Sequence, residues 1–379
     1  MKVLKFGGTS VGSAQRMKEV AKLITDGEKK IVVLSAMSGT TNTLVEISDY
    51  LYKKNPEGAN EIINKLETKY KQHIDELFAT PEYKQKGLEI IKSHFDYIRS
   101  YTKDLFTLFE EKVVLAQGEL ISTAMVNFYL QECGVKSVLL PALEFMRTDK
   151  NAEPDPIYIK EKLLAQLELY PDADIYITQG FICRNAYGEI DNLQRGGSDY
   201  TASLIGAAIN ASEIQIWTDI DGMHNNDPRI VDKTAPVRQL HFEEAAELAY
   251  FGAKILHPTC IQPAKYANIP VRLLNTMDPE APGTLISNDT EKGKIKAKDN
   301  ITAIKIKSSR MLLAHGFLRK VFEIFESYQT SIDMICTSEV GVSVTVDNTK
   351  HLNEILDDLK KYGTVTVDKE MCIICVVGD

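Results

Sequence analysis

The chain lacks an excess of positive charge. Its 44 Lys and Arg residues are outnumbered by 53 Asp and Glu residues, which gives a net charge of −9. A general nucleic-acid-binding protein presents a basic surface, so this composition argues against that class. A nucleotide site needs only local positive charge and is still compatible with the sequence.

Long hydrophobic runs are also absent. No apolar stretch approaches the roughly 18 to 20 residues that a membrane-spanning helix requires. The N-terminus leads directly into Val3-Leu4-Lys5-Phe6 and shows neither a signal-peptide pattern nor an Arg- and Ser-rich transit pattern. We therefore expect a cytoplasmic enzyme without membrane contact.

Cysteine is sparse and dispersed. Six cysteines are spread over 379 residues, which is typical of free thiols in a reducing compartment. Cys372 and Cys375 form a CxxC pair, but no further zinc ligands lie nearby in the sequence. The flanking residues predict a strand, on which positions i and i+3 face opposite sides. Structural thiols are therefore favoured over a metal site.

The sequence alternates β-type apolar runs with stretches of helical periodicity. Strands are expected at residues 2–6, 30–36, 136–140, 174–178, 213–218 and 270–274, and helices at 14–25, 120–133, 158–169, 200–210, 242–251 and 258–266. This alternation predicts an α/β sandwich with a mostly parallel central sheet. The length of the chain favours two domains.

Three segments depart from this alternation. Residues 49–112 are rich in Lys and Glu with apolar residues at helical spacing, and they predict a helical insertion that is broken near Thr80-Pro81. It could be a solvated packing element or could shape the substrate pocket. Residues 289–300 are polar and predict a linker after a first domain of residues 1–288. A pattern of strands and helices over 301–370 then predicts a second, α+β domain.

The last nine residues, 371–379, predict another apolar strand with nothing after it to pack on. A globular domain seldom ends in this way. We therefore expect these residues to be the first strand of a further small domain that is incomplete here.

A glycine-bearing loop follows the first expected strand. The N–H groups of Gly7-Gly8-Thr9-Ser10 could form an anion nest at the start of a helix, and Lys5 would add a charge at the end of the strand. The Rossmann pattern fails because Thr9 takes the third position, and the Walker pattern fails because Ser13 follows the last glycine. Alone, this loop could equally be a tight strand–helix turn.

Other loops offer complementary chemistry. In Arg195-Gly-Gly-Ser198-Asp199 an arginine could clamp a carboxylate, although Asp199 could be only a helix cap. The segment Gly252–Pro258 places a lysine close to a glycine, so that a basic side chain and an accessible backbone could both approach an anion. Trp217–Gly222 and the following Asn-Asp-Pro-Arg could contact a nucleotide or form an Asp-rich turn. Glu119, which we expect near the start of a helix, could pair with an ammonium group or complement the helix dipole.

Together these motifs resemble those of the aspartate kinase family, in the amino acid kinase superfamily, over roughly residues 1–290. The motifs, in the family's order, are KFGGTSVG at 5–12, SAMSGTTN at 35–42, QGE at 117–119, RGGSDY at 195–200, WTDIDG at 217–222 with NNDPR at 225–229, and GAKILHP at 252–258. Residues 311–318 and 331–339 resemble the first ACT module, a ferredoxin-like regulatory domain, of lysine-sensitive members. The last residues, CIICVVGD, resemble the opening of a second ACT module.

The resemblance implies ATP- and Mg²⁺-dependent phosphorylation of the L-aspartate side chain to 4-phospho-L-aspartate, the first step of lysine, threonine and methionine synthesis. The catalytic residues would be Lys5, which would stabilise charge on the transferred phosphoryl group, and Asp199, which would organise Lys5 and the metal–phosphate region. Mg²⁺ would be held by the ATP phosphates, with no direct protein ligand.

The resemblance also assigns binding residues. Phosphate would be bound by Lys5, Gly7, Gly8, Thr9 and Ser10. Aspartate would be bound by Thr41, Glu119, Phe181, Arg195, Ser198 and Asp199, with Arg195 on the α-carboxylate and Glu119 on the ammonium. The nucleotide would be bound by Thr218, Asp219, His224, Arg229, Lys254 and Ile255. The family often has tyrosine where this chain has His224.

Regulation is implied in the same way. Lysine would bind at an ACT interface of a homodimer or homotetramer, lined by Met311, Asp333, Thr337, Ser338 and Glu339. Alternatively, Thr337–Glu339 is only a turn and Asp333 an exposed strand residue. Two other functions compete: a kinase of the same superfamily acting on glutamate or a nucleoside monophosphate, and a non-catalytic amino-acid sensor. The sequence leaves open the effector, the oligomeric state and whether the native chain continues.

Overall fold

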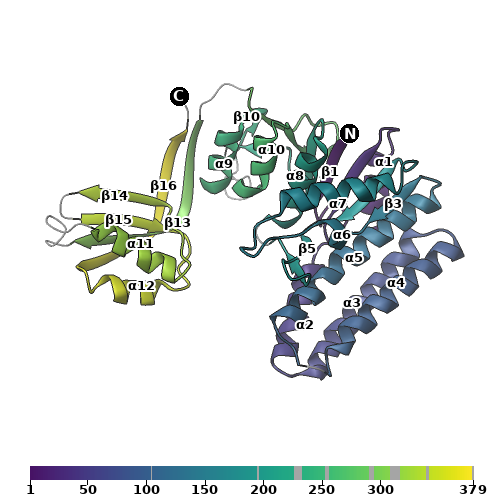
Figure 1. Ribbon diagram of the computed structural model, residues 1–379, viewed down its shortest axis with the longest axis horizontal. Coiled ribbons are helices and arrows are strands. Elements are labelled where there is room, and N and C mark those ends of the chain that lie inside the picture. Colours follow the sequence, from purple (N-terminus) through teal and green to yellow (C-terminus); the bar gives the residue numbers. More distant parts are fainter. Residues whose placement is uncertain are drawn as a thin grey trace. The chain divides into compact units, whose positions relative to one another are not determined.

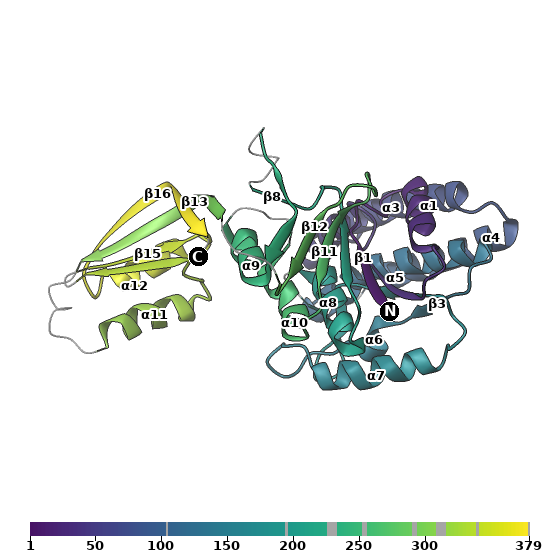
Figure 2. The same ribbon diagram turned by 90° about the horizontal axis from the view of Figure 1, so that it is seen from above.

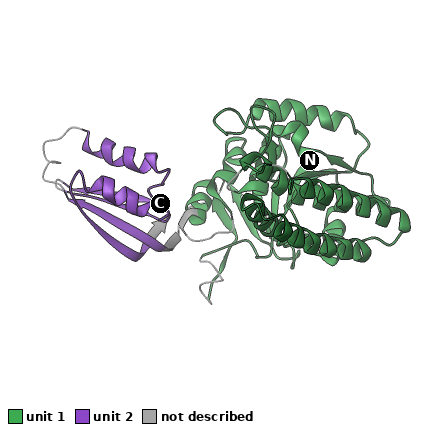
Figure 3. Cartoon of the chain, turned by 90° about the horizontal axis from the view of Figure 1, so that it is seen from below, with its two compact units in different colours: residues 1–292 green, residues 293–379 purple. Residues whose placement is uncertain are grey.

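The computed structural model of the chain describes residues 1–103, 105–193, 196–225, 233–251, 256–289, 294–307, 316–338 and 341–377. The chain divides into two compact units, Met1–Lys292 and Gly293–Asp379 (Figure 3). The division falls inside the segment expected to be a linker. Each unit has its own sheet and core.

The first unit is built on an eight-stranded sheet in the order β10-β12-β11-β7-β1-β2-β4-β3 (Figure 1). These strands are β1 (Lys2–Phe6), β2 (Lys30–Leu34), β3 (Ser137–Leu140), β4 (Ile175–Gln179), β7 (Ile214–Thr218), β10 (Gln239–His241), β11 (Val271–Asn275) and β12 (Thr284–Ser287). Every pairing is parallel except that of β11 with β12. The predicted mostly parallel sheet is therefore confirmed.

Helices cover both faces of this sheet (Figures 1 and 2). They are α1 (Ala14–Ile24), α2 (Thr40–Tyr52), α3 (Pro56–Leu77), α4 (Pro81–Ser100), α5 (Leu108–Glu132), α6 (Ala142–Phe145), α7 (Pro156–Glu168), α8 (Gly197–Ile209), α9 (Phe242–Phe251), η1 (Pro258–Ile261) and α10 (Gln262–Tyr266). Ile31 and Val33 of β2 enter one apolar core with α7 and α8, whereas Val32 and Leu34 enter another with α1, α3 and α4. Because strand side chains alternate, a strand that is apolar at every position lies between two layers.

Two short ribbons complete the first unit. They pair β5 (Ile182–Arg184) with β6 (Ile190–Asn192), and β8 (Met223–His224) with β9 (Pro236–Val237).

The helical insertion is a hairpin of α3 and α4, which confirms the break predicted at Thr80-Pro81. Each helix begins with proline at its first position, where the missing N–H is not needed. The next helix, α5, starts earlier than expected, at a capping box in which Thr107 and Glu110 bond reciprocally. The expectation that Glu119 lies near a helix start is therefore wrong, because this residue is in the middle of α5.

Helix α5 is also the one helix among the described residues that is long and apolar enough to cross a membrane by length and composition. In this fold 72% of its apolar window is buried inside the protein. It is a core helix, which explains its composition.

The second unit has a four-stranded antiparallel sheet in the order β14-β15-β13-β16. Its elements are β13 (Lys294–Lys307), α11 (Phe317–Ser327), β14 (Met334–Ser338), β15 (Gly341–Val346), α12 (Leu352–Leu359) and β16 (Thr364–Val377). Apolar side chains of both helices and of the strands share one core. This is the α+β arrangement that the sequence predicts.

The boundaries of the second unit differ from those predicted. Residues 294–300 belong to β13 and not to a linker, and residues 371–377 continue β16 without a break after residue 370. The reason is long-range pairing, since Lys294–Lys298 pairs with Ile373–Val377. A polar segment with a distant partner strand looks like a linker when only its own composition is considered.

Candidate active site

A buried ion pair lies at the centre of the first unit. Lys5 Nζ, near the end of β1, is 2.7 Å from Asp199 Oδ1, in the first turn of α8, and the two side chains are only 11% and 15% exposed. Strand β1 lies between β2 and β7, and the carboxyl ends of parallel strands gather at one edge of the sheet. The fold therefore brings together the two residues predicted to be catalytic.

The glycine loop after β1 is held close to the segment after β2. A Cβ on Gly8 would lie 2.8 Å from the carbonyl oxygen of Ala36, so only glycine fits without a shift. Ser38 N–H donates to the Gly8 carbonyl at 3.1 Å. A Cβ on Gly7 would lie 3.5 Å from Lys5 Nζ, which places the ammonium beside the loop. No described residue accepts the N–H groups of Gly8 and Thr9, so these amides can serve an anion.

Ser10, another residue predicted to bind phosphate, is buried and bonded within the protein. Its N–H donates to the Gly7 carbonyl at 3.0 Å, and its buried hydroxyl is 2.7 Å from Thr276 Oγ1, just beyond β11. The N–H is therefore occupied by the protein, and the hydroxyl already has one partner in the protein. Ser10 fastens the loop to the sheet, and Gly8 and Thr9 are the better candidates for contacting phosphate.

Four of the residues predicted to bind aspartate line a single cavity of ≈270 Å³. They are Thr41, Glu119, Phe181 and Ser198, and the rest of the lining is Gly8, Ser35, Ala36, Met37, Ser38 and Gly39. Gly8 belongs to the phosphate loop, so this cavity adjoins it. In the segment after β2, only Thr41 is a predicted binding residue. The signal for the rest of the segment is its position at the end of a central strand.

Glu119 is the buried charge of this cavity. It is 3% exposed, and its Oε1 accepts the N–H of Ala36 at 3.2 Å. Oε2 has no hydrogen-bond partner in the described part of the chain. Burial raises the pKa of Glu119 to about 7, and the Ala36 N–H opposes this increase. A carboxylate held in this way would be stabilised by a cation, so an ammonium group suits the site.

Backbone geometry fixes the part of the cavity wall that Phe181 and Ser198 form. Phe181 has a φ of +68°, a conformation that non-glycine residues rarely adopt. Its N–H donates to Thr201 Oγ1 at 3.0 Å, and a Cβ on Gly197 would lie 2.7 Å from Phe181 Cδ2. Ser35 Oγ donates to Ser198 Oγ at 2.9 Å. These contacts bind the start of α8 to the cavity wall.

The predicted nucleotide residues lie partly in the described structure. Thr218 ends β7, beside β1, and its hydroxyl closes a turn with Ile220, while Asp219 is exposed. His224 Nδ1 is 2.8 Å from Thr234 Oγ1. The remaining predicted residues of the site, Arg195, Arg229, Lys254 and Ile255, lie outside the described residues.

Asp221, between these residues, has a structural partner. Arg238 binds both of its carboxylate oxygens, at 3.0 and 2.9 Å, and this pair lowers the pKa of Asp221. This part of the Asp-rich segment therefore shapes the loop.

In the second unit, Thr337 and Ser338 are exposed residues of β14 that pair with Val342 and Gly341. They are not in a turn, so that alternative is wrong for these two residues. Asp333 N–H donates to the Thr345 carbonyl at 2.8 Å. Met311 and Glu339 lie outside the described residues.

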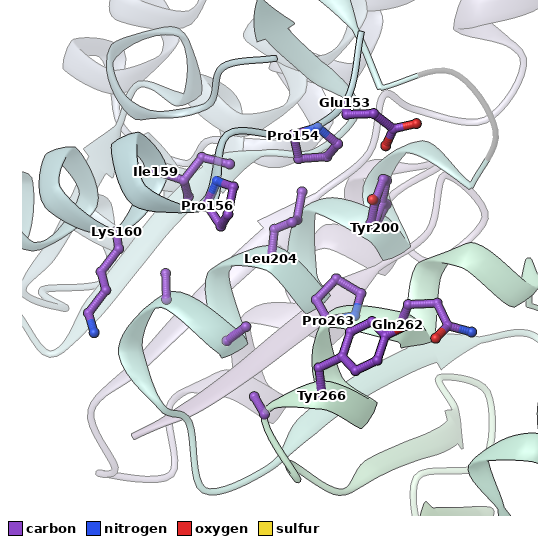
Figure 4. A pocket seen from close by; sticks show the side chains of 13 residues that line it. Glu153, Pro154, Pro156, Ile159, Lys160, Tyr200, Leu204, Gln262, Pro263 and Tyr266 are labelled. Carbon is purple, nitrogen blue, oxygen red and sulfur yellow. The ribbon is translucent and has the colours of Figure 1, made fainter. Parts of the chain in front are cut away.

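A larger cavity, of ≈480 Å³, lies between α7, α8 and α10 (Figure 4). Its lining is mainly apolar, and Glu153 and Lys160 are its charged residues. No predicted site residue lines it. We therefore assign the chemistry to the smaller, polar cavity.

Comparison with known proteins identifies the family of the chain. The amino acid kinase family matches residues 1–275. Aspartokinase 1, chloroplastic, of Arabidopsis thaliana is 38% identical over 402 residues, covering 100% of this chain and 70% of that protein. The chain belongs to the aspartokinases of the amino acid kinase family.

Two bacterial comparisons show the same aspartokinase likeness over the whole chain. Lysine-sensitive aspartokinase 3 of Escherichia coli K12 is 34% identical over 395 residues, covering 100% of this chain and 87% of that protein. The crystal structure of E. coli aspartokinase III in complex with aspartate and ADP superposes with a TM-score of 0.86 at 32% identity, covering 100% of this chain and 88% of that one. The aspartokinase fold therefore includes both units.

Proposed function

We propose that this chain phosphorylates the side-chain carboxylate of L-aspartate with MgATP, which yields 4-phospho-L-aspartate for lysine, threonine and methionine synthesis. The observation that carries the proposal is the cavity that joins Glu119 to the glycine loop beside Lys5. An amino group, a carboxylate acceptor and a phosphate could be held there side by side. The E. coli relative crystallised with aspartate and ADP supports the same pair of ligands.

In this proposal Glu119 binds the substrate ammonium and Arg195 binds the α-carboxylate, with Thr41, Phe181 and Ser198 completing the pocket. The side-chain carboxylate is then directed toward the phosphate loop. A carboxylate is already a nucleophile, so no general base is required. Phosphoryl transfer depends mainly on positioning and charge neutralisation.

Lys5 provides the charge that two anionic reactants need in order to approach each other. Asp199 holds the Lys5 ammonium in place through their ion pair. The amides of Gly8 and Thr9 can cradle phosphate. Mg²⁺, when bound with ATP, would neutralise phosphate charge; the described residues contain no cluster of three or more His, Cys, Asp or Glu that could hold a metal. The nucleotide would extend toward Thr218, Asp219, His224, Arg229, Lys254 and Ile255.

We further propose feedback inhibition by lysine through the second unit, with Met311, Asp333, Thr337, Ser338 and Glu339 as the effector residues. The E. coli relative named for its lysine sensitivity supports this choice of effector. Assembly as a homodimer or homotetramer through that unit, and a cytoplasmic location, belong to the same proposal.

The test is ADP release from MgATP with L-aspartate, with L-glutamate as the control, repeated in the presence of lysine and of threonine. We expect turnover that depends on aspartate and falls with lysine. Turnover with glutamate and not with aspartate would show that glutamate is the substrate. Turnover that does not change with lysine would show that lysine is not the effector. Absence of turnover with both amino acids would favour a non-catalytic sensor.

A further inference from the structure

The helical insertion reaches the amino-acid cavity through one side chain. Tyr70 of α3 is only 1% exposed, and its hydroxyl is 2.8 Å from Thr40 Oγ1, a buried hydrogen bond between α3 and the first residue of α2. The Tyr70 ring packs against Phe95 of α4, with 5.8 Å between ring centroids. The hairpin therefore holds this hydroxyl in a fixed place.

Thr40 connects Tyr70 to the cavity on two sides. Its N–H donates to the carbonyl of Met37 at 3.0 Å, and both Met37 and Thr41 line the cavity. A Cβ on Gly118 would lie 3.2 Å from Thr40 Cγ2, so the threonine methyl packs against the residue before Glu119. A shift of Thr40 would move the loop and the glutamate relative to each other.

Tyr70 stays neutral in this position. Burial raises its pKa, the Thr40 hydrogen bond opposes this increase, and the nearby Glu119 carboxylate adds to it. The phenol is therefore protonated throughout the pH range in which Glu119 titrates. It can act as a fixed anchor and not as an acid or base.

We propose that Tyr70 is a positioning residue of the amino-acid pocket, which fixes Thr41 and the segment 35–39 against Glu119 through its hydrogen bond to Thr40. This inference rests on the proposed function and gives the insertion a part in it. Small displacements of binding groups weaken a site built on several elements, so the effect should appear in the affinity for the amino acid.

The first test is Tyr70→Phe, which removes only the hydroxyl. We expect the KM for aspartate to rise about tenfold, which corresponds to ~1.4 kcal/mol of binding free energy. The KM for ATP and kcat should each change by no more than about twofold. The matched control is Tyr97→Phe, since the Tyr97 hydroxyl is also bonded, to Tyr101 at 2.9 Å, but lies on an exposed part of α4. An unchanged KM for aspartate in Tyr70→Phe, or equal losses for both substrates, would overturn the proposal.

The second test approaches the same bond from Thr40. Thr40→Val should raise the KM for aspartate, and Thr40→Ser, which keeps the hydroxyl, should raise it less. The double variant Tyr70→Phe/Thr40→Val leaves no buried hydroxyl unpaired, so its effect should be smaller than the product of the single effects. If the effects of the two single substitutions on the KM for aspartate multiply in the double variant, Tyr70 does not act through Thr40. If Tyr70→Phe does not fold, the comparison of Thr40→Val with Thr40→Ser decides the same question.

Wild-type turnover with aspartate tests the proposed function separately. Should the wild type bind aspartate without turnover, the aspartate-induced rise in Tm replaces KM, and a smaller rise in Tyr70→Phe than in Tyr97→Phe supports the positioning role. A wild type whose Tm does not respond to aspartate would overturn both proposals.

Discussion

Lys5 and Glu119 are both buried charged residues, but their surroundings differ. Lys5 has a carboxylate partner at 2.7 Å, whereas one oxygen of Glu119 has no hydrogen-bond partner among the described residues. An unpaired buried charge is unfavourable until a ligand of opposite sign arrives. At the scale of single residues, Lys5 is therefore held in place before a ligand binds, whereas Glu119 depends on the ligand for a partner.

The affinity for aspartate should depend on pH through Glu119. Because its folded pKa is about 7, above the ordinary 4.5, the folded protein binds an extra proton between these values. The stability of the ligand-free protein should therefore fall as pH rises from about 4.5 to 7. The KM for aspartate should rise as pH falls from 8 to 6, because the protonated acid cannot pair with an ammonium group.

The control for this prediction is Glu119→Gln. We expect this variant to bind aspartate weakly at every pH and to lose the change in KM between pH 6 and 8. A wild-type KM that is flat over this range would show that Glu119 does not titrate there or does not contact the ammonium group.

Lys5 should matter more for turnover than for binding. Lys5→Ala should lower kcat by about 10²–10³-fold, because the ammonium stabilises charge that develops during transfer. The dissociation constant for ATP should rise much less, and isothermal titration of both proteins measures it. Equal losses in kcat and in ATP affinity would contradict a role specific to the transition state.

At the scale of elements, the turn before α8 decides how Ser198 and Asp199 are presented. Gly196 has a φ of +80°, and a Cβ there would collide with the sulfur of Cys260 on η1. The turn therefore needs glycine for both its conformation and its space. The start of α8, which carries half of the Lys5–Asp199 pair, depends on this contact.

Gly196→Ala should therefore lower both stability and activity. We expect a loss of more than the ~1 kcal/mol due to the left-handed conformation, together with a clear drop in kcat. Gly134→Ala is the control, because Gly134 also has a positive φ of +77° but open space around it. Urea unfolding and turnover of both variants measure the difference. Similar behaviour of the two would mean that the Cys260 contact is unimportant.

The strands and helices of the first unit were largely predictable because their signals are local. The apolar run of residues 30–34 directly predicts strand β2, and the proline at position 81 directly predicts the start of α4. The pairing of β13 with the end of β16 was not predictable, since it joins segments far apart in the sequence. The same holds within the site: a motif at the end of a strand indicated Lys5 and a helical motif indicated Glu119, whereas the inward position of Ser10 depends on Thr276.

At the scale of the whole molecule, two units with separate cores allow catalysis and control to be tested separately. Asp333→Ala, in the second unit, should raise the lysine concentration needed for half-inhibition by at least about tenfold and leave activity without lysine unchanged. Asp357→Ala is the control, since Asp357 is an exposed acidic residue of the same unit that pairs with Lys360. Unaltered lysine inhibition in Asp333→Ala would remove this residue from the effector site.

The central place of β1 has a consequence for the order of events during synthesis. One neighbour of β1 is β2, which leaves the ribosome soon after it, but the other is β7, at residues 214–218. Until β7 emerges, one edge of the strand that carries Lys5 is without its partner, and Asp199 is made only shortly before β7. The nascent chain therefore acquires its ion pair late, and during much of translation the apolar edge of β1 is a natural target for chaperones.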